Sequence, residues 1–216
     1  MTTHRVQTLY TQKARLYEFF FVELLQWGKV LEVFFRENDY LQFGMKILDA
    51  GCGTGAVSRV LHHLARKQGL AGITFHGFDL TSAMLELFRQ WMEREGARGI
   101  TLRQANVLEL ENQLPPDWTD YDLIVSSAMF EYLPKEKFGP ALSNLGLLLK
   151  ENGRLLVLIT KRTWLTQWLG GKWWGANLYT QGELEAEFQQ AGFTTIQFKA
   201  LPDWWRSSML AVEAKK

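Results

Sequence analysis

Short apolar runs bounded by glycine or aspartate alternate with longer segments of helical periodicity from Gly44 onward, and this alternation constrains the fold more than any other feature. The predicted strands are Lys46–Ala50, Ile73–Phe78, Ile100–Gln104, Tyr121–Ser126 and Arg154–Thr160. The predicted helices are Thr54–Gln68, Ser82–Glu95, Pro140–Lys150 and Glu183–Ala191. Runs as continuously apolar as LLVLI are typical of parallel strands buried on both faces. The pattern therefore predicts an α/β fold, a doubly wound sheet with right-handed crossovers and helices on both faces.

The two ends of the chain follow other patterns. Apolar residues recur at helical spacing over about Arg5–Asn38, which predicts one or two amphipathic N-terminal helices ahead of the first strand. Near the other end, Thr194–Ala200 and Ser208–Ala214 read as two strands with a turn near Pro202 between them. These strands would extend the sheet beyond its five parallel members.

The chain contains no internal repeat, low-complexity tract or linker. We therefore expect an N-terminal helical cover over residues 1–44 and a main domain over residues 45–216, which together form a single compact domain overall. The main domain carries an aromatic-rich insertion at about residues 161–180.

Composition excludes several classes of protein. The chain has 24 Lys+Arg against 23 Asp+Glu, a formal net charge of +1, whereas a partner such as a long nucleic acid demands a basic excess. The single Cys52 excludes a disulfide framework and a multi-thiolate metal site. The first residues are polar where a signal peptide is apolar, and no stretch approaches the roughly 18 apolar residues of a membrane span. We expect a cytoplasmic protein without a metal ion.

A glycine-rich loop follows the first predicted strand directly, in the run Asp49-Ala50-Gly51-Cys52-Gly53-Thr54-Gly55. Glycines let the chain turn tightly and bring backbone N–H groups close to a ligand beside a helix N-terminus. Asp79 ends the second predicted strand, where a carboxylate binds the ribose hydroxyls in doubly wound nucleotide folds. Each acid also has a structural alternative: Asp49 could cap the glycine loop, and Asp79 the helix that begins near Ser82.

Five segments in order carry a family resemblance: ILDAGCGTG, GFDLTSAML, QANVLEL, YDLIVSSAMFEYLP and LLLKENGRLLVL. Over roughly Ile47–Thr160 the chain resembles the class I S-adenosylmethionine-dependent methyltransferases. The resemblance implies a Rossmann-like, seven-stranded, mostly parallel sheet that ends in an antiparallel C-terminal hairpin, with the N-terminal helices lying over the active site. It also implies S-adenosylmethionine as the cofactor and S-adenosylhomocysteine as its product.

Carried over by position, the resemblance implies eleven cofactor contacts: Asp49, Gly51, Cys52, Gly53, Gly55, Asp79, Leu80, Met84, Asn106, Val107 and Ser126. Asp49 would lie near the amino group of the methionine part, and Asp79 would bind the ribose diol. Asn106 stands where the family usually has an Asp that binds the adenine amino group, and its carbonyl oxygen can accept the same hydrogen bond. Cys52 has no base partner in the sequence, so we interpret it as a small apolar filler rather than a nucleophile.

In this family the acceptor pocket is built from the N-terminal helices, the segment after the fourth strand and the insertion after the fifth. Aromatic residues are frequent in all three places, and the implied acceptor contacts are Tyr17, Phe20, Phe130, Trp168, Trp173 and Trp174. A general base is needed only where the acceptor must lose a proton. The candidates for that role are Tyr17, Glu131 and Tyr132.

The tryptophans of the insertion have three interpretations. Trp164 and Trp168 have the spacing of the buried stripe of a short helix. The cluster could equally form an aromatic lid over a flat, apolar or cationic acceptor. Exposed tryptophans beside Lys161 and Arg162 could also touch a membrane surface that holds a lipid-like acceptor. The sequence does not choose among these.

The resemblance implies a methyltransferase that moves a methyl group to a small, apolar or aromatic acceptor by direct in-line displacement. Positioning of the acceptor alone can supply about 7–11 kcal/mol of the barrier. One alternative is a nicotinamide-dependent oxidoreductase, because Gly51–Ala56 satisfies the dinucleotide pattern G-x-G-x-x-G/A. Helices ahead of the first strand and the lack of room for a second catalytic domain disfavour it. The second alternative is a non-catalytic protein that binds S-adenosylmethionine. The sequence carries no signal for an oligomeric state.

Overall fold

The computed structural model describes residues 27–163, 176–202 and 205–216. The strands in this part of the chain are β1 (Lys46–Ala50), β2 (Thr74–Asp79), β3 (Ile100–Gln104), β4 (Tyr121–Ser127), β5 (Leu149–Thr160), β6 (Thr195–Lys199) and β7 (Met209–Lys215). The α-helices are α2 (Trp27–Glu37), α3 (Ala56–Lys67), α4 (Ser82–Glu95), α5 (Leu110–Gln113), α6 (Phe138–Leu147), α8 (Gln181–Gln190) and α9 (Trp205–Ser208). Two short 3₁₀ turns, η2 (Phe130–Tyr132) and η3 (Lys135–Lys137), lie between β4 and α6.

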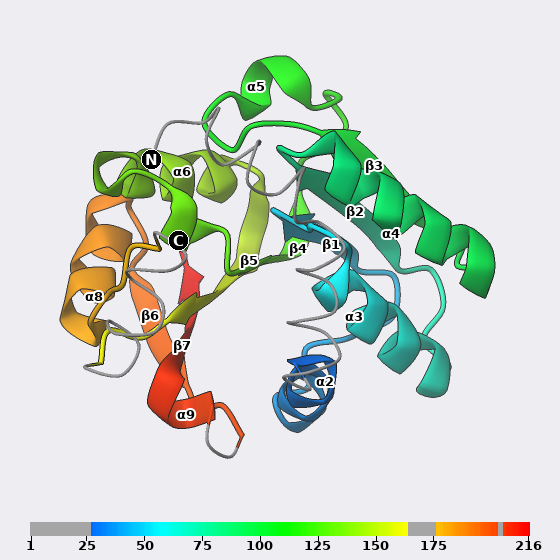
Figure 1. The fold of residues 1–216 in the computed structure, drawn as a ribbon, viewed down its shortest axis with the longest axis horizontal. Coiled ribbons are helices and arrows are strands. Elements are labelled where there is room, and N and C mark those ends of the chain that lie inside the picture. Colours follow the sequence, from blue (N-terminus) through cyan, green and yellow to red (C-terminus); the bar gives the residue numbers. More distant parts are fainter. Residues whose placement is uncertain (1–26, 164–175, 203–204) are drawn as a thin grey trace.

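The described strands form one seven-stranded sheet in the order β3-β2-β1-β4-β5-β7-β6 (Figure 1). The first five strands pair in parallel, and β7 runs antiparallel to both β5 and β6. From β1 the chain winds outward through β2 and β3, then returns to place β4 on the other side of β1. This reversal makes the carboxyl ends of β1 and β4 the topological switch point, where open α/β sheets bind ligands.

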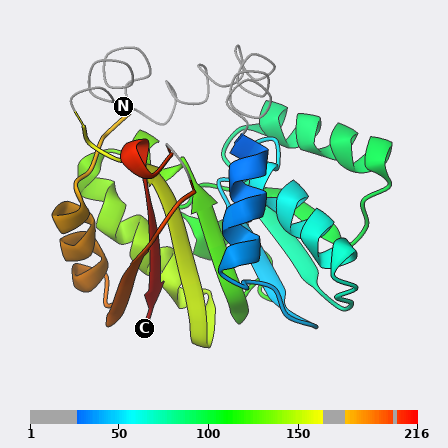
Figure 2. The same cartoon turned by 90° about the horizontal axis from the view of Figure 1, so that it is seen from below.

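Two apolar cores cover the two faces of the sheet, because successive side chains of a strand point to opposite faces. Ile47 of β1 belongs to the core beneath α2, α3 and α4, and its neighbour Leu48 belongs to the core beneath α6 and α8. Figure 1 shows α6 and α8 on the opposite side of the sheet from α2 and α3. Figure 2 shows α2 beside α3, against which it packs.

The expected fold class is confirmed: the sheet is mixed and mostly parallel, with the antiparallel C-terminal strands and a helix ahead of the first strand. The expectation was wrong for Pro140–Lys150, because α6 spans Phe138–Leu147 and Lys150 belongs to β5. Pro140 falls in the first turn of α6, where its missing N–H costs no hydrogen bond. The four-residue helix α9 replaces part of the turn expected near Pro202.

Helix α8 begins with a reciprocal cap. The hydroxyl of Thr180 accepts the N–H of Glu183, and the Glu183 carboxylate accepts the N–H of Thr180. Leu184 and Phe188 then bury the apolar stripe of the helix completely. This cap therefore sets where the chain turns back toward the sheet after β5.

Much of the expected N-terminal cover and of the aromatic insertion lies outside the described residues, so the domain boundaries stay a prediction. The described part of the cover is α2, whose Leu31 and Phe34 are fully buried. Of the helices that the structure describes, none combines the length and the apolar character needed to cross a bilayer.

Candidate functional site

The glycine loop leaves β1 at the switch point and passes beneath the end of β2. The N–H groups of Gly51 and Cys52 both donate to the carbonyl of Phe78, at 2.9 Å each. The N–H of Gly53 donates to Asp79 Oδ2 at 2.9 Å. These three hydrogen bonds join the loop to the end of β2.

Two glycines of this loop serve different purposes. Gly53 has φ +52°, and a Cβ built on it meets no atom within 4 Å, so its backbone faces open space. Gly55 has φ +92°, and a Cβ there would stand 2.5 Å from the ring of Phe88 on α4. Gly53 thus leaves the backbone bare to a ligand, whereas Gly55 allows α3 and α4 to pack closely.

Asp79 is held by backbone donors on two sides. Its Oδ2 accepts the Gly53 N–H, and its Oδ1 accepts the Thr81 N–H at 2.8 Å. Burial raises the pKa of this carboxyl, and the two N–H donors oppose that rise. Helix α4 begins after Thr81 without a side-chain cap, so Asp79 shapes the turn before the helix rather than capping it. Each carboxylate oxygen retains a lone pair for a ligand hydroxyl.

Asp49 is a buried acid at the end of β1, only 2% exposed. Its Oδ2 accepts both the N–H of Ser58, at 3.1 Å, and the Ser58 hydroxyl, at 2.7 Å, in the first turn of α3. Burial raises the pKa of Asp49 to about 7, against the lowering effect of these two bonds. The carboxylate therefore binds the first turn of α3 rather than capping the glycine loop, and Asp49 also lines a cavity beside the loop.

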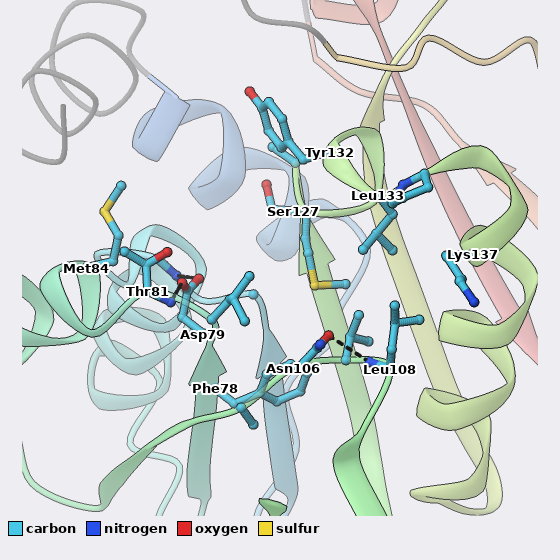
Figure 3. A pocket seen from close by; sticks show the side chains of 18 of the residues that line it. Phe78, Asp79, Thr81, Met84, Asn106, Leu108, Ser127, Tyr132, Leu133 and Lys137 are labelled. Carbon is cyan, nitrogen blue, oxygen red and sulfur yellow. Dashed lines mark hydrogen bonds between the residues drawn. The ribbon is translucent and has the colours of Figure 1, made fainter. Parts of the chain in front are cut away.

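A cavity of about 430 Å³ opens above the carboxyl ends of β1, β2 and β4 (Figure 3). Its walls are mostly apolar, with Phe78, Met84 and Leu108 among them. The predicted cofactor residues that line it are Gly51, Gly53, Asp79, Leu80, Met84, Asn106 and Val107. In Figure 3 the carboxylate of Asp79 and the side chain of Asn106 lie on different walls, with Lys137 across from both. The structure thus brings seven of the eleven predicted residues around one space.

Asn106 is oriented by its own turn. Its Oδ1 accepts the N–H of Leu108 at 3.1 Å, and its Nδ2 donates to Glu109 Oε1 at 3.3 Å. The carbonyl oxygen therefore has one lone pair left for an adenine amino group. The sequence comparison anticipates the position of Asn106, but not that its amide also holds the loop after β3.

A second, smaller cavity of about 140 Å³ adjoins the first, and both are lined by Gly51, Gly53, Ser127 and Ala128. Trp27 of α2 and Trp205 of α9 contribute to its wall, with ring centroids 4.8 Å apart. Asp49, Cys52 and Glu131 line it as well. Burial raises the pKa of the Cys52 thiol well above its usual value, which keeps it protonated and agrees with a filler role.

Glu131 is 4% exposed and lies in η2, just after β4. Its Oε2 accepts the N–H of Thr160, at the end of β5, at 2.9 Å. Its backbone carbonyl accepts the N–H of Asn177 at 2.6 Å. Burial raises the pKa of Glu131, and the bonds from Thr160 oppose the rise. A carboxyl held in this way at a cavity wall can accept a hydrogen bond or a proton from a ligand.

Three predicted contacts lie away from both cavities. Ser126 is fully buried and donates to the Ala50 carbonyl at 2.9 Å, so it joins β4 to β1, and the next residue, Ser127, faces the cavities. Gly55 serves packing, as described above. Phe130 is 1% exposed and packs against Phe138 with ring centroids 4.7 Å apart, which makes it part of the core.

Tyr132 lines the larger cavity, and Figure 3 shows its ring pointing away from Asp79 and Asn106. The other predicted acceptor and base residues lie outside the described residues: Tyr17, Phe20, Trp168, Trp173 and Trp174. Sequence reasoning missed Trp27, Trp205 and Met209 as cavity residues. Only Trp27 had a signal, the apolar spacing of its helix, and that signal indicates burial rather than a ligand.

Residues 47–153 match a family model described as a methyltransferase domain. The ubiquinone biosynthesis O-methyltransferase of Actinobacillus pleuropneumoniae serotype 5b is 35% identical over 103 residues, which cover 44% of this chain and 41% of that protein. The malonyl-[acyl-carrier protein] O-methyltransferase of Anoxybacillus flavithermus is 33% identical over 110 residues, 51% of this chain and 37% of that protein. The chain thus covers less than half the length of these curated relatives.

Solved structures share the fold over more of the chain. The TehB-like S-adenosylmethionine-dependent methyltransferase of Corynebacterium glutamicum has a TM-score of 0.64 and 20% identity, with 95% of this chain and 98% of that chain covered. The magnesium protoporphyrin IX methyltransferase of Synechocystis PCC 6803, solved with bound S-adenosylhomocysteine, also has a TM-score of 0.64 and 20% identity. That comparison covers 88% of this chain and 81% of the other.

Proposed function

Because residues 47–153 belong to the class I, S-adenosylmethionine-dependent methyltransferases, we propose that this chain transfers a methyl group from S-adenosylmethionine to a small apolar or aromatic acceptor. The observation that carries the proposal is the position of Gly53. This residue lines both cavities without a side chain, and its N–H donates to the Asp79 carboxylate. A cofactor that passes Gly53 would place its sulfonium group between the larger cavity and the smaller one.

The residues at the larger cavity fit the cofactor. Asp79 offers free lone pairs to a ribose diol, and Leu80, Met84 and Val107 offer an apolar slot to a purine. Asn106 offers a carbonyl oxygen to the purine amino group. Gly53 leaves room for a chain that passes close to the backbone, since no side chain occupies that space. A volume of about 430 Å³ lies within the range of about 300–1,000 Å³ that ligand pockets occupy.

When bound, the cofactor supplies a methyl group on a sulfonium, an electrophile that an acceptor attacks in line. The protein has to hold the acceptor at the correct distance and angle, and it has to exclude water. The buried side chains of Trp27, Trp205 and Met209 help to exclude water beside Gly53. The acceptor class of the curated relatives, small molecules and a carrier-bound malonyl group by their names, supports a small acceptor here.

Calorimetric titration with S-adenosylhomocysteine, and in parallel with NAD⁺ and NADH, tests the proposal. We expect binding of S-adenosylhomocysteine at about micromolar Kd, near 8 kcal/mol of binding free energy, and no binding of the nicotinamides. Binding of the nicotinamides alone would overturn the proposal in favour of an oxidoreductase.

Turnover separates an enzyme from a protein that only binds the cofactor. We expect S-adenosylhomocysteine to accumulate when the chain is incubated with S-adenosylmethionine and a panel of phenols, amines and quinones. Tight binding of S-adenosylhomocysteine without turnover across that panel would instead favour a binding protein that has lost catalysis.

A further inference from the structure

A closed ring of hydrogen bonds borders the larger cavity, in the loop after β3. Asn106 Nδ2 donates to Glu109 Oε1 at 3.3 Å. Gln113 Nε2 donates to Glu109 Oε2 at 2.8 Å, and Gln113 Oε1 accepts the backbone N–H of Asn106 at 2.6 Å. Of the three residues, Asn106 alone lines the cavity. Both carboxylate oxygens of Glu109 are therefore engaged in holding a residue of the cavity wall.

The ring and the turn after Asn106 together fix the direction of its side-chain amide. Asn106 Oδ1 accepts the N–H of Leu108 at 3.1 Å, the bond drawn between these two residues in Figure 3. A reversed amide would set its NH₂ group against the Leu108 N–H and its oxygen against the Glu109 carboxylate. Both hydrogen bonds would then be lost, and groups of like partial charge would face each other. Glu109 is the side chain that opposes this reversal.

The loop that carries the amide is anchored at two further points. Asn144 of α6 donates from Nδ2 to the Val107 carbonyl at 2.9 Å. Gln104, at the end of β3, donates from Nε2 to the Leu80 carbonyl at 3.0 Å. Because Leu80 and Val107 both line the cavity, these bonds hold its walls in place. The Asn106 amide thus has a fixed place as well as a fixed direction.

An amide fixed in this direction matches one kind of purine edge. Asn106 Oδ1 keeps one lone pair, and Nδ2 keeps one hydrogen. Adenine presents an amino donor at C6 beside a ring-nitrogen acceptor, and an asparagine amide pairs with such an edge through both of its groups. Hypoxanthine presents a carbonyl oxygen at C6, which would face the amide oxygen. The wall therefore favours adenine.

We propose that Glu109, held by Gln113, is a positioning residue that fixes the Asn106 amide and makes the cavity select a 6-aminopurine over a 6-oxopurine. This inference rests on the proposed function, because it takes the purine of S-adenosylhomocysteine as the ligand beside Asn106. Glu109 does not line the cavity, so it acts on the ligand through Asn106.

The first experiment compares two ligands that differ only in the purine. Wild type and Glu109→Ala are titrated calorimetrically with S-adenosylhomocysteine and with S-inosylhomocysteine, its 6-oxopurine analogue. We expect the wild type to prefer S-adenosylhomocysteine at least about tenfold. E109A should reduce that ratio at least about threefold, since only the Leu108 N–H then opposes reversal of the amide. The exposed Glu111→Ala, two residues along the same segment, is the matched control and should keep the wild-type ratio.

The second experiment is a double-mutant cycle at neutral pH. Asn106→Asp replaces the Nδ2 donor by a charged oxygen that faces Glu109, so affinity for S-adenosylhomocysteine should fall about tenfold. Glu109→Gln in that background supplies a donor to the carboxylate and should restore most of the affinity. E109Q alone keeps an oxygen for Asn106 and should lower affinity by no more than about threefold. A merely structural role for Glu109 would not make the effect of E109Q depend on residue 106.

Each contrary outcome has a separate meaning. Equal affinity of the wild type for the two ligands would show that the amide does not select the purine, and would overturn the proposal. An equal loss for both ligands in E109A, or the same effect of E109Q in both backgrounds, would make Glu109 a brace of the loop and also overturn it. If E109A fails to fold, the cycle still decides, because its substitutions keep the side-chain sizes. Failure of the wild type to bind S-adenosylhomocysteine would instead contradict the proposed function.

Discussion

At the scale of single residues, Asp79 connects the glycine loop to a ligand. Asp79→Ala removes the acceptor for a ribose diol, and hydrogen bonds to a charged group contribute roughly 1.5–3 kcal/mol. We expect affinity for S-adenosylhomocysteine to fall about ten- to a hundredfold by calorimetry. Asp79→Asn keeps one oxygen for a backbone N–H and should lose less. Unchanged affinity in a folded D79A protein would locate the ribose site elsewhere.

Gly53 and Gly55 form a matched pair two residues apart. Gly53→Ala places a methyl group in open space, at a left-handed φ that costs about 1–2 kcal/mol, so the protein should fold and lose cofactor affinity. Gly55→Ala drives a methyl group into Phe88 and should lower the free energy of unfolding by more than about 2 kcal/mol. Urea unfolding and titration with S-adenosylhomocysteine measure both. Equal effects on stability would contradict this division of roles.

The residues that sequence reasoning misplaced share one cause. The run Val125-Ser126-Ser127 shows where β4 ends but not which serine faces the ligand, because a register change of one residue exchanges the two faces of a strand. Phe130 follows the strand end in a 3₁₀ turn, whose side-chain directions no periodicity reveals. By contrast, Asp79 and Gly53 were predictable, since both stand at the end of a strand that apolar runs identify.

At the scale of elements, the strands of the parallel sheet followed the sequence closely. β1 and β3 have the predicted bounds, β2 is shifted by one residue at both ends, and β4 is one residue longer, because buried parallel strands are marked by continuous apolar runs. The prediction was wrong for the start of β5, which begins at Leu149 rather than Arg154. The short helices α5 and α9 could not be predicted, since four residues show no helical period. Trp205 of α9 lines the smaller cavity, so this part of the cavity wall could not be predicted from the sequence.

The cap of α8 offers a test at the same scale. Thr180→Ala removes the hydroxyl that accepts the Glu183 N–H, and loss of such a cap costs about 1 kcal/mol. We expect that decrease in the free energy of unfolding measured in urea, with Thr180→Ser restoring most of it. The cap lies outside both cavities, so affinity for S-adenosylhomocysteine should hold. A T180A protein as stable as the wild type would show that this cap does not contribute to the stability of the fold.

At the scale of the whole molecule, Asp49 makes stability depend on pH. Its pKa rises from an ordinary 3.8 to about 7 on folding, because burial disfavours the charged form. The native state therefore binds more protons than the unfolded chain between these values, and this contribution to stability is lost as pH rises toward 7. Three pKa units correspond to about 4 kcal/mol. Urea unfolding between about pH 4 and pH 8 should show a larger loss in the wild type than in Asp49→Asn, in which Asp79 and Glu131 still have raised pKa values.

The same carboxylate should couple cofactor binding to pH in the opposite direction. Below about pH 7 Asp49 is protonated and offers no charge to the ammonium group of S-adenosylhomocysteine, whereas above it the ionised acid attracts that group. Calorimetric affinity should therefore rise between about pH 6 and pH 8 in the wild type and stay flat in D49N. A rise that persists in D49N would mean that a different group titrates, and the bond between Asp49 and Ser58 would then account for Asp49 entirely.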